Sequence, residues 1–170
     1  MAPPYPYRAF LRARDELCAK TFVETGTYHG AIPLWASDHF DEVYTIEASS
    51  ELWLSLDKRD PKVKFLLGDS GVVLRDLVPN LGSSVFWLDA HYSGPGTNRG
   101  GGECPLLAEL DAISKSLMKH RVFIDDVRLF SGQLGPELTP ADWPTIKQVR
   151  EFPGLKVLAD HGDILEMERC

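Results

Sequence analysis

The stretch Phe22-Val23-Glu24-Thr25-Gly26-Thr27-Tyr28-His29-Gly30 decides the fold of this 170-residue chain. A short apolar run ends in an acid, and two glycines four positions apart then lead into a segment with a helical pattern. Seventeen residues after Gly30, the run Val43-Tyr44-Thr45-Ile46-Glu47 ends in a second acid. Glycines let the backbone approach a ligand closely, and a carboxylate after the next strand can hold two ribose hydroxyls. The two runs together predict a site for a ribose-bearing ligand; an ordinary glycine turn is the alternative for the first run alone.

The composition is that of a globular protein. Hydrophobic residues make up 44% and charged residues 25% of the chain, and the length suits one domain, which we expect to span residues 1–170. No apolar stretch is long enough to cross a bilayer, and the N-terminus lacks the layout of a signal peptide. We therefore expect a cytoplasmic protein with no membrane partner. The three scattered cysteines have no metal-finger spacing and are expected to be free thiols.

The charge balance bears on the partner. The net charge is −7, and basic residues are grouped only at Lys58-Arg59 and at Lys62 and Lys64. Most of such a surface repels a phosphate backbone. We therefore expect a small-molecule substrate and no nucleic-acid partner.

Apolar runs of strand length alternate with helical stretches along the chain. Strands are predicted at 21–26, 42–47, 63–69, 85–89 and 121–125, and helices at 7–19, 30–39, 50–58, 70–78, 105–119 and 143–152. Two further strands, 155–158 and 164–168, are joined by a turn at 160–163. Near-continuous apolar strands separated by helices indicate an α/β protein with a mostly parallel sheet covered on both faces. The last two strands predict an antiparallel edge.

Two long polar loops, 91–104 and 127–143, follow the fourth and fifth predicted strands. In a parallel sheet, ligands bind at the carboxyl ends of the strands, where these loops begin. Loops of this length are uncommon in compact domains and are often functional. The glycine-rich part Ser93–Glu103 is expected to act as a lid; a plain connection is the alternative. The loops are expected to define the substrate.

Five segments at the predicted strand ends occur in an informative order: Glu24–Gly30, Thr45–Glu47, Gly68–Ser70, Val85–Asp89 and Ile124–Asp126. Together they resemble the class I S-adenosylmethionine-dependent methyltransferases, in particular the small divalent-metal-dependent O-methyltransferases of the catechol and macrocin types. The resemblance covers residues 20–130, and the final hairpin fits the antiparallel last strand of that family. It implies a Rossmann-like three-layer sandwich with a mostly parallel seven-stranded sheet and an antiparallel strand at the C-terminal edge.

The resemblance also implies a set of residues that bind S-adenosyl-L-methionine. The segment Glu24–Gly30 would shape the turn against the methionine part of the cofactor, and Glu47 would hold the ribose hydroxyls. Asp69, with Ser70 beside it, would face the adenine edge; a cap of the following helix is the alternative, and both roles can coexist. The implied cofactor-binding residues are Glu24, Gly26, Thr27, Tyr28, Gly30, Glu47, Asp69, Ser70 and Asp89.

A magnesium site is a further implication. In the metal-dependent relatives, acids after the fourth and fifth strands hold one Mg²⁺, which here would use Asp89, Asp125 and Asp126. Three carboxylates at neighbouring strand ends repel one another unless a cation or proton neutralises them, and a bound metal lowers the pKa of a substrate hydroxyl. The alternative is that Asp89 contacts the cofactor while Asp125 and Asp126 cap a loop and pair with Arg128.

His91 and Asp89 are the candidate catalytic residues. His91 could act as a general base, bind a metal, pack against the adenine, or be an ordinary polar residue. Catechol-type enzymes have a lysine shortly after the fourth-strand acid, where this chain has Tyr92-Ser93-Gly94, so the base is open. Arg128 could recognise an anionic substrate or pair with neighbouring acids.

The sequence therefore favours methyl transfer from S-adenosylmethionine to a small molecule, with oxygen favoured as the acceptor atom because of the metal site. One alternative is a non-catalytic cofactor- or partner-binding domain of the same fold. Another is a nicotinamide-dependent oxidoreductase, but the dinucleotide fingerprint G-x-G-x-x-G needs three glycines where residues 26–31 read G-T-Y-H-G-A. A second copy of the chain could complete the pocket, so a homodimer is also considered.

Overall fold

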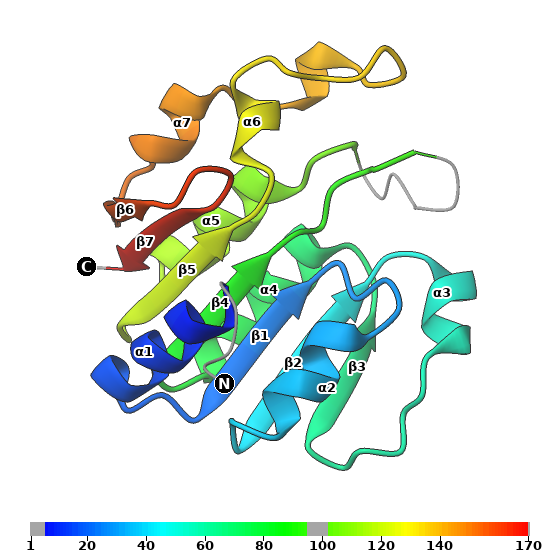
Figure 1. The fold of residues 1–170 in the computed structure, drawn as a ribbon, viewed down its shortest axis with the longest axis vertical. Helices are drawn as coiled ribbons and strands as arrows, with labels where there is room; N and C mark the ends of the chain where they lie inside the picture. The colour runs from blue at the N-terminus through cyan, green and yellow to red at the C-terminus, as the bar shows by residue number, and fades with distance from the viewer. Residues whose placement is uncertain (1–5, 95–101, 170) are drawn as a thin grey trace.

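The structure is a computed structural model and describes residues 6–94 and 102–169 (Figure 1). Its helices are α1 (Tyr7–Leu17), α2 (Ala31–Ser37), α3 (Ser50–Ser55), α4 (Ser70–Leu77), α5 (Leu106–Ser114), α6 (Val127–Phe130) and α7 (Ile146–Arg150). Two short 3₁₀ helices are η1 (Val78–Asn80) and η2 (Pro140–Asp142). Its strands are β1 (Thr21–Thr25), β2 (Glu42–Glu47), β3 (Val63–Leu67), β4 (Ser84–Leu88), β5 (His120–Ile124), β6 (Leu155–Asp160) and β7 (Leu165–Arg169). Most of the predicted lid, residues 95–101, lies outside the described residues.

All seven strands form one sheet in the order β3-β2-β1-β4-β5-β7-β6. Strands β1 to β5 are parallel, and β7 is antiparallel to both β5 and β6. Helices α1 and α2 cover one face of the sheet, and α4 and α5 cover the other (Figure 1). The predicted fold class, a Rossmann-like sandwich with an antiparallel C-terminal edge, is confirmed.

Successive residues of the central strands face opposite sides of the sheet, and both sides are buried. Every residue of β1, β4 and β5 is buried, as expected for parallel strands between two helical layers. Phe10 of α1 packs its ring against Phe22, Trp87 and Phe123, with centroid distances of 5.0–5.3 Å. On the other side, the buried cluster includes Val23, Phe86, Leu88, Val122 and Ile124 with residues of α4 and α5.

The register of the sheet brings three loops to one place. Thr25 of β1 lies opposite Leu88 of β4, which lies opposite Ile124 of β5. The residues that follow therefore leave the sheet at the same level and on the same edge. The strand order reverses between β1 and β4: β2 and β3 lie on one side of β1, and β4 and β5 lie on its other side. In α/β sheets of this type, ligands bind at this point.

The predicted loop over 127–143 contains two short helical elements that the sequence analysis did not predict. Helix α6 forms directly after β5, and η2 forms near the end of the segment. Four-residue elements leave no amphipathic repeat in a sequence, because they are about one turn long.

The predicted start of the last helix at Trp143 was also wrong. Helix α7 begins at Ile146, and its cap is Thr145, whose side chain and that of Gln148 form a capping box. The Thr-x-x-Gln pattern satisfies two free amide groups at once. The residue before a proline is pushed away from helical geometry, which explains why the helix cannot begin before Pro144.

No helix in the described ranges 6–94 and 102–169 combines the length and apolar character needed to cross a membrane.

Candidate active site

A cavity of about 680 Å³ opens at the carboxyl ends of β1, β2, β4 and β5. Its volume is typical of a site for a small organic ligand. Most of the sequence-predicted site residues line it: Gly26, Tyr28, Glu47, Asp69, Ser70, Asp89, His91, Asp125 and Asp126. The structure thus brings together residues from five separate segments of the chain.

Gly26 lines the cavity directly after β1 and lies against the backbone that follows β4. It has a φ angle of +84°, and a Cβ atom added to it would lie 2.5 Å from the carbonyl oxygen of Asp89. Only glycine accepts both conditions. The backbone after β1 therefore lies directly against the backbone after β4, with no side chain between them.

Glu47, at the end of β2, points into the turn that follows β1. Its Oε2 accepts a hydrogen bond from the Tyr28 backbone N–H at 2.9 Å, and its Oε1 accepts one from the Ser49 N–H at 2.8 Å. Each carboxylate oxygen has two acceptor positions, so these two contacts orient the group and leave it capacity for a ligand. Tyr28 is 53% exposed, and its ring lies against that of His29 with a centroid distance of 3.8 Å.

Glu24, Thr27 and Gly30 do not line the cavity. Glu24 is 2% exposed and accepts a 2.5 Å hydrogen bond from Thr45, whose hydroxyl is 2.6 Å from that of Thr27. Burial raises the pKa of Glu24 well above its usual range, and the charges of Asp89 and Glu47 add to the shift. These residues hold the turn from beneath, and a direct contact of Glu24 with a ligand stays a prediction.

Asp69 is the N-cap of α4, where its Oδ1 accepts a hydrogen bond from the Val72 N–H at 3.2 Å. Asp69 and Ser70 also line the cavity. The capping role that the sequence left open is therefore present. It coexists with a position in which both side chains can meet a ligand.

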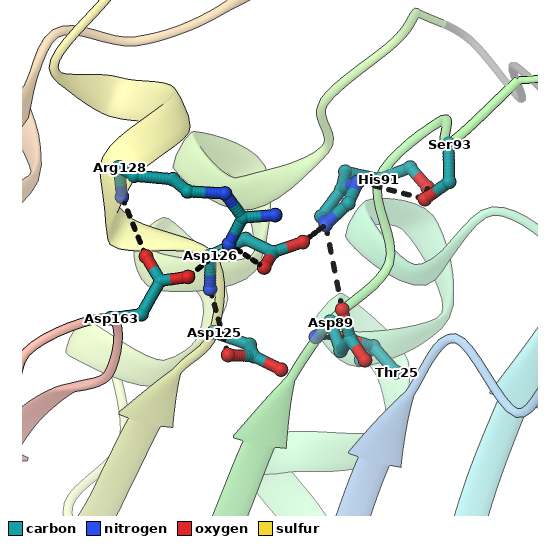
Figure 2. Close-up of polar contacts among 8 residues, drawn as sticks. All are labelled: Thr25, Asp89, His91, Ser93, Asp125, Asp126, Arg128 and Asp163. Carbon is teal, nitrogen blue, oxygen red and sulfur yellow. Dashed lines mark hydrogen bonds and ion pairs between the residues drawn. The ribbon is translucent and has the colours of Figure 1, made fainter. Parts of the chain in front are cut away.

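The other end of the cavity holds a cluster of titratable groups from the ends of β4 and β5. Nε2 of His91 lies 2.7 Å from Oδ2 of Asp126 and 3.5 Å from Oδ1 of Asp89. Nδ1 of His91 lies 3.2 Å from the Ser93 hydroxyl. Figure 2 shows the imidazole between the two carboxylates, above the arrowheads of the strands. His91 is thus held on both sides of its ring.

The electrostatics of the cluster follow from this packing. Burial, together with the charge of Asp125, raises the pKa of Asp89 to about 7. Burial alone would lower the pKa of His91, but the hydrogen bond with Asp126 and the charge of Asp89 outweigh it, so this pKa lies above its ordinary value. The same hydrogen bond and Arg128 hold the pKa of Asp126 below its usual range. The cluster is therefore a place where negative charge is crowded and a cation is stabilised.

The contacts of Arg128 separate the two alternatives for this residue. Its Nη1 donates to carboxylate oxygens of both Asp126 and Asp163 (Figure 2). The guanidinium pairs with neighbouring acids, as one alternative proposed, and it does not line the cavity. Asp125 lines the cavity, but its Oδ1 accepts a hydrogen bond from the Asp126 N–H at 2.8 Å.

The predicted metal ligands fit a divalent cation in part. Asp89, His91 and Asp126 each offer one ligand atom, and the three atoms lie within 4.8 Å of one another; Asp125 is not in this group. Carboxylate oxygens suit Mg²⁺, whereas an imidazole nitrogen suits transition metals such as Mn²⁺ or Zn²⁺ better. The donor chemistry therefore fits Mg²⁺ through the carboxylates, with His91 as a further nitrogen ligand or as a base.

Two acids that sequence reasoning missed belong to the site. Glu103 lines the cavity, and Glu109 of α5 lies fully buried behind Asp89 and His91. Burial raises the pKa of Glu109 to about 7, and the neighbouring Ser70 and Thr25 hydroxyls oppose the shift only in part. Glu109 had a signal in the sequence, because it falls three residues after Leu106, on the apolar face of the helix. Glu103, within a glycine-rich loop, had none.

No protein-family model matches the sequence, and no curated protein is similar to it in sequence. The fold, by contrast, matches solved structures. The O-methyltransferase TomG of Streptomyces achromogenes, in complex with S-adenosylmethionine, has a TM-score of 0.68 and 16% identity, over 99% of this chain and 81% of that one. The Podospora anserina methyltransferase PaMTH1, bound to S-adenosylhomocysteine, has a TM-score of 0.64 and 18% identity, over 99% and 79% of the two chains. An rRNA methylase of Streptococcus thermophilus has a TM-score of 0.56 and 9% identity, over 99% of each chain. The chain therefore has the Rossmann-like fold of the class I S-adenosylmethionine-dependent methyltransferases.

Proposed function

We propose that this protein transfers a methyl group from S-adenosylmethionine to an oxygen atom of a small molecule. The observation that carries the proposal is the continuous cavity, which has Glu47 and Asp69 at one end and His91 and Asp126 at the other. A carboxylate that would bind the ribose and a cluster that would accept a proton thus line one space, on a fold that methyltransferases use.

The cofactor end is supported by the chemistry of its residues. S-adenosylmethionine carries its methyl group on a positively charged sulfur and leaves as S-adenosylhomocysteine once the group is transferred. Glu47, oriented by two backbone N–H groups, would accept hydrogen bonds from the ribose hydroxyls. Gly26 lines the cavity, and its close contact with the Asp89 backbone fixes the turn against which the methionine part would lie. Asp69 and Ser70 would face the adenine.

The acceptor end is supported by the geometry of His91. A general base must lie within hydrogen-bond reach of the proton that it removes, and His91 lines the cavity. Asp126 fixes the orientation of the imidazole and stabilises its protonated form, because the two side chains are 2.7 Å apart. His91 would take the proton of the acceptor hydroxyl, and Asp89, the second carboxylate near the ring, would stabilise the same charge.

A divalent metal is the second part of the proposal. Asp89 and Asp126, whose ligand atoms lie within 4.8 Å of each other, would hold Mg²⁺ at the acceptor end. Asp125, predicted as the third ligand, would have to turn toward the ion; burial and mutual repulsion raise the pKa values of Asp89 and Asp125. Such an ion would lower the pKa of an acceptor hydroxyl and relieve the repulsion among the carboxylates.

The charge of the cavity favours a small neutral or cationic acceptor. Seven acidic residues line it, namely Glu47, Glu51, Asp69, Asp89, Glu103, Asp125 and Asp126, while its described lining includes no lysine or arginine. Nucleic-acid binding relies on basic residues that neutralise phosphates. Although rRNA methylases share the fold, this lining supports a small molecule.

The test is a methyl-transfer assay with radiolabelled S-adenosylmethionine. Catechol, a neutral vicinal diol, serves as the first acceptor, with Mg²⁺ present, and a panel of alcohols and amines follows; an RNA arm uses total rRNA. Label transferred to a hydroxyl, and lost in the His91→Gln variant, is the expected result. Binding of S-adenosylmethionine with no transfer to any acceptor would favour a non-catalytic domain. Binding of NAD in its place would favour an oxidoreductase.

A further inference from the structure

The carboxylate of Glu103 is buried at the boundary between the two long loops. The residue is 1% exposed, and its side chain accepts three hydrogen bonds from the segment that ends the second loop. The donors are the Thr139 N–H at 2.7 Å, the Thr139 hydroxyl at 3.0 Å and Nε1 of Trp143 at 3.0 Å. The Glu103 carbonyl oxygen also accepts a hydrogen bond from the Tyr92 N–H at 2.8 Å. One residue therefore ties the chain after β4 to the chain before α7.

Trp143 contacts both Glu103 and the candidate base, His91. Its indole is 7% exposed and lies against the His91 imidazole at a centroid distance of 5.4 Å and against Phe130 of α6 at 6.0 Å. Trp143 does not line the cavity, whereas His91 does. The indole therefore contacts the imidazole from a position outside the lining of the cavity.

We propose that Glu103 is a positioning residue for His91: its buried carboxylate fixes the Trp143 indole, which with Asp126 holds the imidazole in the orientation that faces the acceptor. This inference rests on the proposed function only in the role that it assigns to His91. A buried carboxylate is costly unless several donors satisfy it, and an apolar residue would fill the same volume without that cost. The three directional contacts provide what an apolar residue could not, namely a fixed position for one particular ring.

The effect should be separable from cofactor binding. The residues that would hold the ribose and adenine belong to β2, α4 and the turn after β1, and within residues 6–94 and 102–169 none of them is hydrogen-bonded to Trp143. Loss of the Glu103 carboxylate is therefore expected to change the surroundings of His91, which two NMR signals can report without any bound cofactor.

The experiment follows the Cε1–H proton of His91 and the Nε1–H group of Trp143 by NMR, and needs no acceptor. Ring currents from Trp143 make the His91 signal sensitive to the position of the indole. In Glu103→Ala the His91 signal should move and the Trp143 N–H should exchange with solvent at least about tenfold faster, because its buried acceptor is gone. Glu103→Gln, which keeps one acceptor oxygen for both N–H donors, should restore most of the wild-type behaviour. Glu137→Ala, which removes an exposed acid two residues before Thr139, is the control and should change neither signal.

Unchanged His91 and Trp143 signals in Glu103→Ala would overturn the proposal. Should that variant fail to fold, Thr139→Val and Trp143→Phe, each of which removes one side-chain donor, take its place, and an unmoved His91 signal in both would again overturn it. Calorimetry with S-adenosylhomocysteine runs in parallel. A wild-type chain that does not bind this ligand contradicts the proposed function, while the two NMR signals still decide the role of Glu103.

Discussion

Nε2 of His91 lies 2.7 Å from Oδ2 of Asp126, although the two residues are 35 positions apart in the sequence. The contact exists because β4 and β5 are parallel neighbours in register, so that the loops after them begin at the same edge of the sheet. An imidazole that a carboxylate orients is suited to act as a general base. It is the most specific chemical feature of the cavity.

This pairing predicts the effect of Asp126→Asn on catalysis. The substitution keeps the shape but removes the charge that raises the pKa of His91, so kcat should fall roughly 10–100-fold. A neutral base is needed, so activity rises with pH through the pKa of His91; this limb of the pH profile should move to lower pH in the variant. The measurement is kcat against pH with the acceptor found in the transfer assay. A limb that stays in place would show that His91 is not the base.

Removal of divalent metal tests the second part of the proposed function. Treatment with a chelator, followed by dialysis, should lower the rate at least about tenfold, and Mg²⁺ should restore it. Asp89→Asn should bind Mg²⁺ more weakly, because a charged oxygen ligand is lost, so its rate should saturate at higher Mg²⁺. Mn²⁺ and Zn²⁺ serve as comparison ions, since His91 is a nitrogen donor. A rate that is unaffected by the chelator would remove the metal from the mechanism.

The position of Gly26 predicts that one added methyl group lowers the unfolding free energy. In Gly26→Ala the new Cβ would lie 2.5 Å from the Asp89 carbonyl oxygen, in addition to the strain of a φ angle of +84°. Gly162 has a similar φ of +80° but nothing within 4 Å of the added atom, so Gly162→Ala is the matched control. We expect the control to lose about 1 kcal/mol of unfolding free energy and Gly26→Ala to lose about 2 kcal/mol more, because the backbone must move. Urea denaturation measures both, and equal losses would contradict the close backbone contact.

His120 predicts a dependence of stability on pH. It is fully buried, its Nδ1 accepts a hydrogen bond from the Ser84 N–H, and burial lowers its pKa to about 4. An unfolded histidine has a pKa of about 6.5, so the unfolded chain binds more protons between these values. The contribution of His120 to the unfolding free energy is fully present above about pH 6.5, and it falls by about 3 kcal/mol as the pH falls toward 4.

The contribution of His120 is isolated by comparing unfolding free energies of the wild type and His120→Gln across this range. Other buried groups such as Glu24 and Glu109 have raised pKa values and act in the opposite direction, but they are common to both proteins. The difference between the two should therefore shrink as the pH falls. A constant difference would mean that the imidazole is not neutral and buried as described.

The sheet could be predicted from the sequence because its strands carry a strong signal. Runs such as Val85–Leu88 and Val122–Ile124 are apolar without interruption, which follows from burial on both faces, and each ends in the acid that marks the edge of the sheet. The order of strands, with β1 beside β4, was accessible only through the resemblance to a known family. Short elements such as α6 have no periodic signal and were missed.

The residues of the candidate site could also be predicted from the sequence only in part. Residues that lie at strand ends, such as Glu47 and Asp89, were found because strand ends can be located from sequence. Whether a residue such as Glu24 faces the ligand or lies beneath it depends on side-chain direction, which the motif does not contain. Glu103 and Trp143 meet only because two irregular loops pack together, and loop conformation has no simple sequence pattern.

The central claim is that the acids along this edge of the sheet hold a ribose-bearing methyl donor. The most direct measurement is calorimetric titration of S-adenosylhomocysteine into the wild-type chain, Glu47→Ala and Glu51→Ala, with NAD titrated separately. We predict one site per wild-type chain, an affinity reduced roughly 10–100-fold in Glu47→Ala through loss of charged hydrogen bonds, and little change in Glu51→Ala, whose exposed side chain lines the same cavity. Absence of S-adenosylhomocysteine binding to the wild type, or equal affinities for all three proteins, would contradict the account.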